Sequence, residues 1–294
     1  MNNSRGILLM LFSMLTFAIH DAFIKGLQGI IPVSLLIFLM GIFGAVFFIC
    51  TCLITKQRPF SASFFNKAII ARNLGEVFGA IGIASSIQAT SLSATSAIQQ
   101  LVPTVVTLGA VIFLGQTIGW RRWAAIVFGF FCVMLIIKPG MNTFAPTSLW
   151  ALMGVAGLSL RDIATKRIKV DISAVQLSVY AYVTLIPAGA LLILIMGDSF
   201  IPNPQGYPML AGTIVFSLLA YVSITLSIQM SDITVVIPFR YTRLLFALIF
   251  GFVFFAERPD VWTLVGAAGI IVSGIFLMIR ERDISPLSST PTTR

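Results

Sequence analysis

Two acid–base pairs recur at one spacing in a chain that otherwise avoids charge. Asp21 and Lys25 lie in the run IHDAFIKG, and Asp162 and Lys166 lie in the run LRDIATKR, so the second half of the chain repeats the pair of the first. Residues four apart on a helix are neighbours, so each pair can partly neutralise itself and anchor its helix. Charges of this kind inside apolar segments also serve as gates and proton relays.

His20, the single histidine of the chain, directly precedes Asp21. An imidazole changes its charge near neutral pH and can pass a proton to a neighbouring carboxylate. A histidine that only packs between helices is an equal alternative. The candidates for a gate or for proton coupling are therefore His20, Asp21, Lys25, Asp162 and Lys166.

A second group of polar residues lies in a later apolar run. The segment VVIPFRYTRLLF carries Arg240 and Arg243, which are three residues apart and share one face of a helix. A central arginine costs about 2.5–3.5 kcal/mol on membrane-insertion scales, so something has to offset two of them. Pro238 removes a backbone hydrogen bond, and broken helices are tolerated in a membrane only where they are buried or line a cavity.

Glu76, in the run ARNLGEVFGAIG, and two adjacent glutamines supply further polar groups at membrane depth. We expect these runs to enclose a central substrate-binding cavity, lined by Glu76, Gln99, Gln100, Arg240, Tyr241 and Arg243. One carboxylate against two deep arginines leaves a surplus positive charge, which a substrate carboxylate would satisfy. The alternative is a structural ion pair of Glu76 with Arg243 or Arg72 that locks helices together.

The composition indicates which elements position these residues. Of the 294 residues, 58% are hydrophobic and only 10% are charged, whereas a soluble domain has about 25% charged residues. The chain is therefore expected to be an integral membrane protein. Its net charge of +9 is scattered between apolar runs, which argues against a nucleic-acid partner. Its cysteines lie inside apolar runs without metal-ligand spacing, so neither a metal nor another cofactor is expected.

The apolar runs are long enough for ten membrane-spanning helices, since one span needs roughly 20 apolar residues. The expected spans are 6–24, 31–54, 67–88, 93–115, 120–137, 148–165, 174–196, 207–229, 233–255 and 261–280. Most lysines and arginines outside the spans fall on the side of the N-terminus, and only Lys25, Lys138 and Arg258 fall on the other side. Both termini are therefore expected in the cytoplasm.

The shift in numbering that carries Asp21 onto Asp162 also superimposes the first five apolar runs on the last five. We call it the repeat shift. Because five is odd, the second half has to enter the membrane from the opposite side, as in the inverted repeats of secondary transporters. The expected fold class is thus all-α integral membrane, with ten transmembrane helices as two inverted five-helix repeats. The repeats would comprise residues 1–141 and 142–282, followed by a disordered cytoplasmic tail, 283–294.

With these features the sequence resembles the drug/metabolite transporter superfamily, in its ten-helix EamA-like branch. The resemblance covers nearly the whole chain and rests on the five-plus-five layout, on FAIHDAFIK in span one and on ITVVIPFRYTRLLFALIFGFVFFAERPD in span nine. It implies a basket-like bundle with a central cavity and alternating access, and a bacterial inner membrane as the location. Span nine looks like that of S-adenosylmethionine uptake carriers, in which Arg240 and Tyr241 would occupy the Arg-Tyr positions of the motif.

The expected function is secondary transport of a small organic metabolite by alternating access. S-adenosylmethionine or another carboxylate-bearing metabolite is the expected substrate, with riboflavin uptake and amino-acid or drug efflux as alternatives within the superfamily. The lipid bilayer is the second expected partner, and a homodimer is left open. A membrane enzyme is the alternative of another class, but one histidine and no paired acidic motif argue against it.

Overall fold

The computed structural model describes residues 3–114, 119–138, 146–230 and 236–282, and the expected tail 283–294 lies outside these ranges. Helices are the regular elements of the described residues. The helices of the first half are α1 Asn3–Gly26, α2 Val33–Ile54, α3 Lys67–Ala89, α4 Leu92–Gln99, α5 Val102–Leu114 and α6 Trp120–Ile137. Those of the second half are α7 Leu149–Lys166, α8 Ala174–Met196, α9 Tyr207–Met230, η4 Ile237–Tyr241, α11 Thr242–Phe255 and α12 Val261–Arg282. Short 3₁₀ turns η1 Ala62–Phe65, η2 Pro146–Ser148 and η3 Pro204–Gly206 precede α3, α7 and α9.

These helices occupy all ten segments in which the sequence predicts a span. Among the described residues, five segments, Ser4–Gly26, Val33–Ile54, Lys67–Ala89, Ala174–Met196 and Pro204–Ser227, are long and apolar enough to cross a membrane. Two shorter apolar helices, within α6 and α12, accompany them. The chain is thus an all-helical, multi-pass membrane protein.

Two of the expected spans are not continuous helices. The fourth is divided into α4 and α5, with tight bonds from Gln100 N to the Ala97 carbonyl (3.2 Å) and from Leu101 N to the Ile98 carbonyl (3.0 Å). Pro103 has no N–H to donate to the Gln99 carbonyl, which accounts for the break. The ninth begins as the 3₁₀ helix η4 and continues as α11. The two breaks lie at equivalent positions, since the repeat shift carries Gln99 and Gln100 onto Arg240 and Tyr241.

Equivalent helices of the two halves run antiparallel to each other. The repeat shift relates the first residues of α2 and α8, Val33 and Ala174, and likewise those of α6 and α12. Within the first pair, Gly41 faces Ile186 and Gly44 faces Tyr182, so the numbers rise in α2 as they fall in α8. Within the second pair, Gly266 faces Ile136 while Ser273 faces Gly129.

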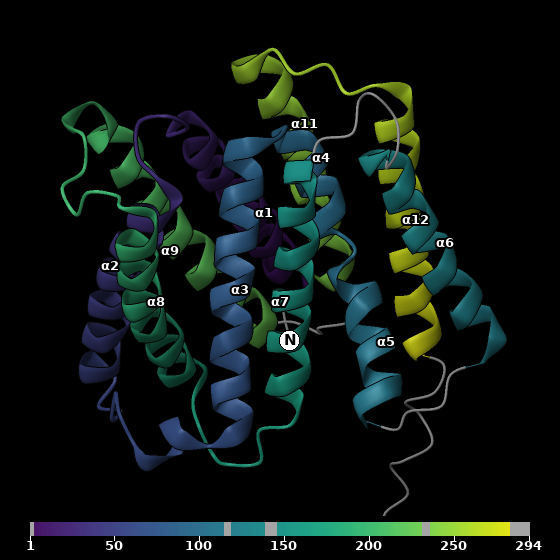
Figure 1. Ribbon diagram of the computed structural model, residues 1–294. Helices are drawn as coiled ribbons and strands as arrows, with labels where there is room; N and C mark the ends of the chain where they lie inside the picture. The colour runs from purple at the N-terminus through teal and green to yellow at the C-terminus, as the bar shows by residue number, and fades with distance from the viewer. Residues whose placement is uncertain (1–2, 115–118, 139–145, 231–235, 283–294) are drawn as a thin grey trace, which may run out of the picture.

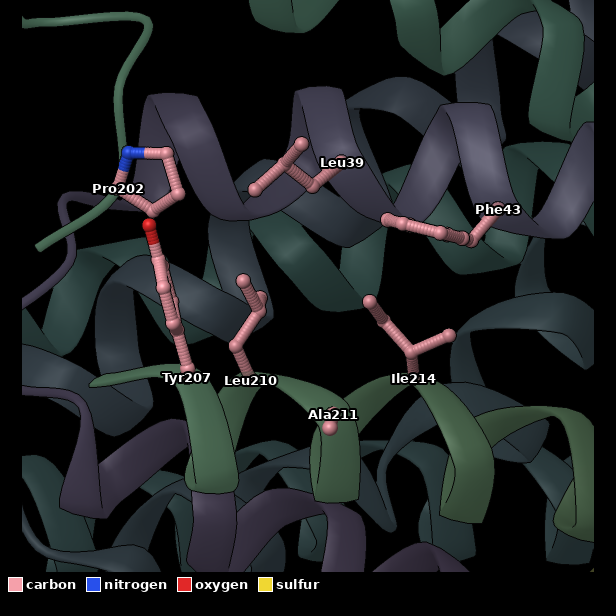
Figure 2. A pocket seen from close by; sticks show the side chains of 7 residues that line it. All are labelled: Leu39, Phe43, Pro202, Tyr207, Leu210, Ala211 and Ile214. Atoms are coloured by element: carbon pink, nitrogen blue, oxygen red, sulfur yellow. The ribbon is translucent and has the colours of Figure 1, made fainter. Parts of the chain in front are cut away.

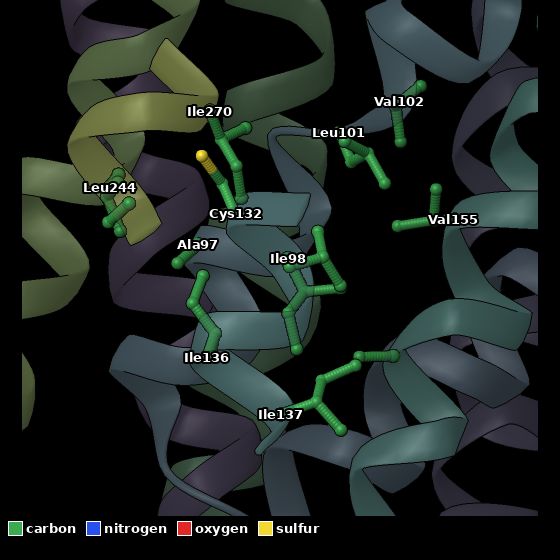
Figure 3. Close-up of a cluster of buried hydrophobic side chains, with 13 residues drawn as sticks. Ala97, Ile98, Leu101, Val102, Cys132, Ile136, Ile137, Val155, Leu244 and Ile270 are labelled. Carbon is green, nitrogen blue, oxygen red and sulfur yellow. The ribbon is translucent and has the colours of Figure 1, made fainter. Parts of the chain in front are cut away.

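The halves also pack on each other through every long helix. α3 lies on α7, α1 on α9, α2 on α8 and α6 on α12 (Figure 1). A buried apolar cluster between α4, α5, α6, α7, α11 and α12 surrounds the break in the fourth span, with Ile98, Leu101 and Ile270 among its members (Figure 3). The core therefore lies between the halves rather than within each of them.

The C-terminal ends of α1 and α3 lie at one end of the bundle, because Ile24 and Leu27 share an apolar cluster with Ile83 and Ile87. We call this the Lys25 end. The opposite end, at which α3 begins, is the Lys67 end. The antiparallel partners α7 and α9 run from the Lys25 end to the Lys67 end.

The interface of α3 with α7 depends on glycines. A Cβ atom on Gly157 would lie 2.3 Å from the Gly79 nitrogen, and one on Gly82 would lie 2.4 Å from the Gly154 nitrogen. The helices therefore approach to main-chain contact, as small residues permit in membrane bundles.

We expect Gly157→Val to lower the free energy of unfolding by about 1–3 kcal/mol or more, because the new side chain has to separate α3 and α7. Thermal unfolding in detergent measures this effect. Gly119→Ala is the control, since a Cβ atom there would have no neighbour within 4 Å. Equal melting temperatures for the two variants would contradict the close approach.

Candidate functional site

Six charged side chains from five elements form a row across the middle of the bundle, which we call the charged row. In spatial order these residues are Glu76 of α3, Arg161 and Asp162 of α7, Arg240 of η4, Arg243 of α11 and Asp21 of α1. Each belongs to a segment that the sequence makes apolar, where a charge without compensation inside the protein is costly.

Asp21 and Arg243 close one end of the row with a bidentate ion pair. Arg243 Nη2 donates to Oδ1 at 2.8 Å and to Oδ2 at 2.7 Å, and its Nε donates to Oδ2 at 3.0 Å. The Asp21 side chain is only 1% exposed, against 17% for Arg243. The guanidinium also lies over the Phe17 ring, 4.8 Å from its centroid. Planar two-point pairing of this kind is the strongest that arginine makes with a carboxylate.

His20 is buried next to this pair. Its Nδ1 lies 3.0 Å from the Thr213 carbonyl oxygen of α9. A carbonyl only accepts, so Nδ1 carries the proton of this bond. The bond fixes the ring between α1 and α9.

Glu76 and Arg161 form the other end of the row. Arg161 Nη1 lies 3.5 Å from Glu76 Oε1, and Arg72 Nη2 lies 3.8 Å from Oε2. Arg161 Nε donates to Asp162 Oδ1 at 2.8 Å. Arg72 also donates to Leu177 O of α8 at 3.2 Å. These contacts join α3, α7 and α8 near the start of α3.

Arg240, in the middle of the row, is exposed, whereas the next residue, Tyr241, is buried. The charges of Asp162, Arg161 and Arg243 act on its guanidinium. Within the described part of the chain, however, this guanidinium has neither a hydrogen bond nor an ion pair closer than 4.0 Å. Its positive charge is the least compensated of the row.

The expected cavity residues are thus brought together only in part. Glu76, Arg240 and Arg243 belong to the row. Gln99 is half-buried at the end of α4, and Gln100 is buried in the break after it. Tyr241 is 6% exposed and its hydroxyl is directed at Gly274 of α12. The ring that the sequence places in the cavity therefore packs between helices in this structure.

The acid–base pairs do not neutralise themselves within one helix. Asp21 bonds to Arg243, while Lys25 Nζ donates to the Thr90 carbonyl at 2.5 Å. Asp162 bonds to Arg161 instead of Lys166, which is exposed. The alternative pairing of Glu76 with Arg243 is likewise not observed, whereas its pairing with Arg72 is, at 3.8 Å.

Two charged residues with contacts in this region, Arg161 and Glu257, were not among the site residues predicted from the sequence. Arg161 is the arginine inside span six, and the signal for it was its position directly before Asp162. Glu257 follows α11 and accepts bonds from Leu92 N (2.6 Å), Ser93 N (3.0 Å) and Ser93 Oγ (2.7 Å). It thus satisfies the first N–H groups of α4, where a negative charge is favourable.

Hydrogen bonds connect several helices of the bundle at the Lys25 end. Glu257 joins the second half to α4, Lys25 joins α1 to Thr90, and Gln88 Nε2 donates to the Ile31 carbonyl at 3.1 Å. An apolar cluster at this end includes residues of α1, α2, α3, α4, α8, α9 and α11. Toward the Lys67 end, separate clusters lie between α2 and α8 and between α1, α9 and η4.

An apolar groove of about 290 Å³ lies apart from the charged row, between α2 and α9 (Figure 2). Its lining comprises Leu39, Phe43, Pro202, Tyr207, Leu210, Ala211 and Ile214. None of these seven lining residues is charged, so the groove offers no charge complementarity to a polar ligand.

Known proteins match both halves of the chain. The model of the EamA-like transporter family matches residues 4–138 and again residues 145–280. A solved crystal structure superposes on 96% of this chain and 99% of its own with a TM-score of 0.62 and 14% identity, which shows a shared fold.

Curated relatives carry transporter names. An S-adenosylmethionine uptake transporter of Rickettsia felis is 25% identical, covering 72% of each chain. A riboflavin transporter of Brucella anthropi is 28% identical, covering 67% of this chain and 69% of its own. A pseudopaline exporter of Pseudomonas aeruginosa is 23% identical, covering 92% and 95%.

We expect Arg243→Gln to lower the free energy of unfolding by about 3–5 kcal/mol, because it leaves the Asp21 carboxylate buried and unpaired. The double variant with Asp21→Asn should recover part of this loss, since neither charge then remains. Denaturant titration of the four proteins in detergent measures the coupling. Lys169→Gln, at an exposed lysine, should change stability by less than about 0.5 kcal/mol. Strict additivity of the two single variants would contradict the pairing.

Proposed function

This chain belongs to the EamA-like transporter family, and we propose that it is a secondary carrier that moves a small, carboxylate-bearing organic metabolite through the middle of the bundle by alternating access. The names of its relatives support a membrane transporter rather than an enzyme. The observation that carries the substrate proposal is the guanidinium of Arg240 in the charged row, which is exposed and has no ion-pair partner among the residues that the structure describes.

An inverted repeat of five plus five transmembrane helices is part of the proposal. It is supported by the two family matches, by the repeat shift between helix starts and by the antiparallel course of α2 with α8 and of α6 with α12. In our proposal the repeats are residues 1–141 and 142–282. Two such halves can pack in two equivalent ways and so open one site to either side in turn.

The charge pattern favours an anionic group on the substrate. Along the row the signs alternate from Glu76 through Arg161 and Asp162, and then Arg240 and Arg243 place two positive charges side by side. With Arg72, four arginines face three carboxylates, which leaves a net positive charge. A substrate carboxylate beside Arg240 would restore the alternation with a charge-assisted hydrogen bond.

The substrate is proposed as S-adenosylmethionine or another carboxylate-bearing metabolite. The relative from Rickettsia felis is named for S-adenosylmethionine uptake, and this molecule carries a carboxylate. Riboflavin uptake is the second candidate, favoured by the likeness to riboflavin transporters, and efflux of an amino acid or drug is a third.

The bonds at the Lys25 end support a gate. If the chain lies in a bacterial inner membrane with both termini in the cytoplasm, the Lys25 end faces outward and the Lys67 end faces the cytoplasm. The bonds made by Lys25 and Glu257 would then close the outer side in this conformation. His20 and Asp21 are our candidates for proton coupling, because a proton on Asp21 would release Arg243 from its ion pair.

Reconstituted protein should take up labelled S-adenosylmethionine into liposomes with saturable kinetics. Arg240→Gln should lower the uptake at least about tenfold, because it removes one charge-assisted bond, with little change in melting temperature. Arg58→Gln, at an exposed loop arginine, is the matched control. Failure of the wild type to move S-adenosylmethionine, riboflavin and neutral amino acids alike would contradict the proposed function.

Gln99→Cys, in a variant without the three native cysteines, reports from which side of the membrane the middle of the bundle is accessible. We expect a membrane-impermeant maleimide to label it from the cytoplasmic side. Glu257→Gln should increase labelling from the outer side, because it weakens the bonds that hold α4. If the Gln99→Cys protein that keeps Glu257 were labelled from the outer side alone, the assignment of the gate would be contradicted.

A further inference from the structure

Two loops lie side by side at the Lys67 end (Figure 1). Residues 55–66, which we call the first loop, join α2 to α3, and residues 167–173, which we call the second loop, join α7 to α8. Ser173 Oγ in the second loop donates to Gln57 Oε1 in the first at 2.6 Å. Two segments that are far apart in the sequence therefore share one surface at this end of the bundle.

Tyr180 of α8 fixes the position of the first loop. Its side chain is buried, and its hydroxyl accepts from the main-chain N–H of Ser61 at 3.0 Å and from Gln176 Nε2 at 3.0 Å. The Phe64 ring packs edge-on against the Tyr180 ring, with the two centroids 5.0 Å apart. Ile168 of the second loop packs against the same apolar cluster as Phe64. Both loops are thus held against α8 and its neighbours.

This surface carries a surplus of positive charge. Among the described residues, the ammonium groups of Lys56, Lys67 and Lys169 have no ion pair within 4.0 Å. Their charge is therefore available to an anion from outside the protein. The two loops and the first residue of α3 together hold five exposed bases and one exposed acid, which are Lys56, Arg58, Lys67, Arg167 and Lys169 against Asp171.

Two large apolar side chains of the first loop lie outside the core. Phe60 is 51% exposed and Phe65 is 76% exposed. In a chain that crosses a bilayer, such rings can lie among the acyl chains directly beneath the head groups. Lysines beside them can extend their flexible stems to the phosphate groups. The first loop therefore has the composition of a segment that lies in the membrane interface.

The backbone at Lys56 motivates a role for its side chain. Lys56 directly follows the last turn of α2 and has a φ of 54°, which lies in the left-handed region. Glycine is the usual residue at such a position, because a Cβ atom makes this conformation costly. A strained residue of this kind is a reason to look for a function of its side chain.

We propose that the two loops bind the head group of an anionic phospholipid. We call the binding site the lysine surface, which comprises Lys56, Phe60, Phe65, Lys67 and Lys169. The lysines pair with the phosphate group, and the phenylalanines contact the upper part of the acyl chains. The first loop belongs to the first half of the chain and the second loop to the second half, so one bound lipid contacts both halves. This inference goes beyond the proposed transport, because it concerns the membrane and not the substrate.

A specific site differs from general attraction to an anionic bilayer. General attraction depends on how many basic residues lie near the membrane, whatever their arrangement. Arg121 of α6 and Arg258 before α12 are exposed and lie outside the lysine surface. They therefore offer a matched pair of charges, whose loss should affect a specific site much less than the loss of two surface lysines.

The test uses the purified full-length protein in detergent, with phosphatidylglycerol, phosphatidylcholine or inorganic phosphate added. We expect phosphatidylglycerol to raise the melting temperature, because it binds the folded protein, and its affinity by native mass spectrometry to exceed that of phosphatidylcholine about tenfold. Inorganic phosphate should cause no shift, because it has no acyl chains to contact the phenylalanines. Salt at about 0.5 M should weaken the binding of phosphatidylglycerol, because it screens exposed charges.

Variants locate the site. Lys56→Gln combined with Lys169→Gln should lower the affinity for phosphatidylglycerol about 10- to 30-fold, because each lysine near an anionic head group contributes about fivefold. Arg121→Gln combined with Arg258→Gln should lower it by less than about threefold. Lys56→Gly should weaken lipid binding without lowering the melting temperature of the lipid-free protein, since glycine suits the left-handed backbone. Phe65→Ser should weaken binding at low and high salt alike.

Equal affinities for phosphatidylglycerol and phosphatidylcholine, or equal losses in the two double variants, would overturn the inference. A shift with inorganic phosphate as large as that with phosphatidylglycerol would indicate a site for soluble anions and would overturn it as well. None of these measurements depends on uptake, so their outcome and that of the transport experiments can be told apart.

Discussion

A charge that is held away from water is stabilised only by opposite charge and by hydrogen bonds, and an unpaired one is costly. This constraint governs the middle of the bundle. Asp21 is almost fully buried because Arg243 gives it three short bonds. Arg161 can lie between Glu76 and Asp162 because both carboxylates compensate it. Arg240 has no such partner in the part of the chain that the structure describes, and it is the most exposed member of the row.

The packing of the helices makes this arrangement possible. Glycines of α3 and α7 bring two main chains into contact, and the same interface carries the ion pair of Glu76 with Arg161. The bonds to the start of α4 hold the opposite end of the bundle. Apolar side chains fill the space between the two halves of the chain. The position of one half relative to the other therefore depends on apolar packing as well as on polar bonds.

Much of the fold could be predicted from the sequence because apolar periodicity and chain breaks are local signals. The ten helical segments and the recurrence of the pattern in the second half followed from these signals, whereas the family followed from the resemblance of the motifs in spans one and nine. The partners within the charged row did not. Four-residue spacing favours Asp21 with Lys25, yet a bidentate arginine from α11 replaces the lysine. Such a choice depends on which helices lie side by side, and periodicity carries no information about that.

Tyr241 illustrates the same limit at a single position. Its neighbour Arg240 is exposed, and the Arg-Tyr motif of the resemblance placed both residues in the expected cavity. In η4, however, successive side chains point in different directions, and the tyrosine packs on Gly274. Conversely, the break of span nine was signalled by Pro238, because a proline removes a donor wherever the helix lies.

The charged row joins two groups of helices that pack separately, and this has a mechanical consequence. Asp162 belongs to the packed pair of α3 and α7, whereas Arg240 belongs to a turn that packs on α1. A molecule that bonded to residues of both groups would hold these helices together, and its release would separate them again. The bound and the free protein would then differ in stiffness, and the two groups of helices would slide past each other more easily when nothing is bound.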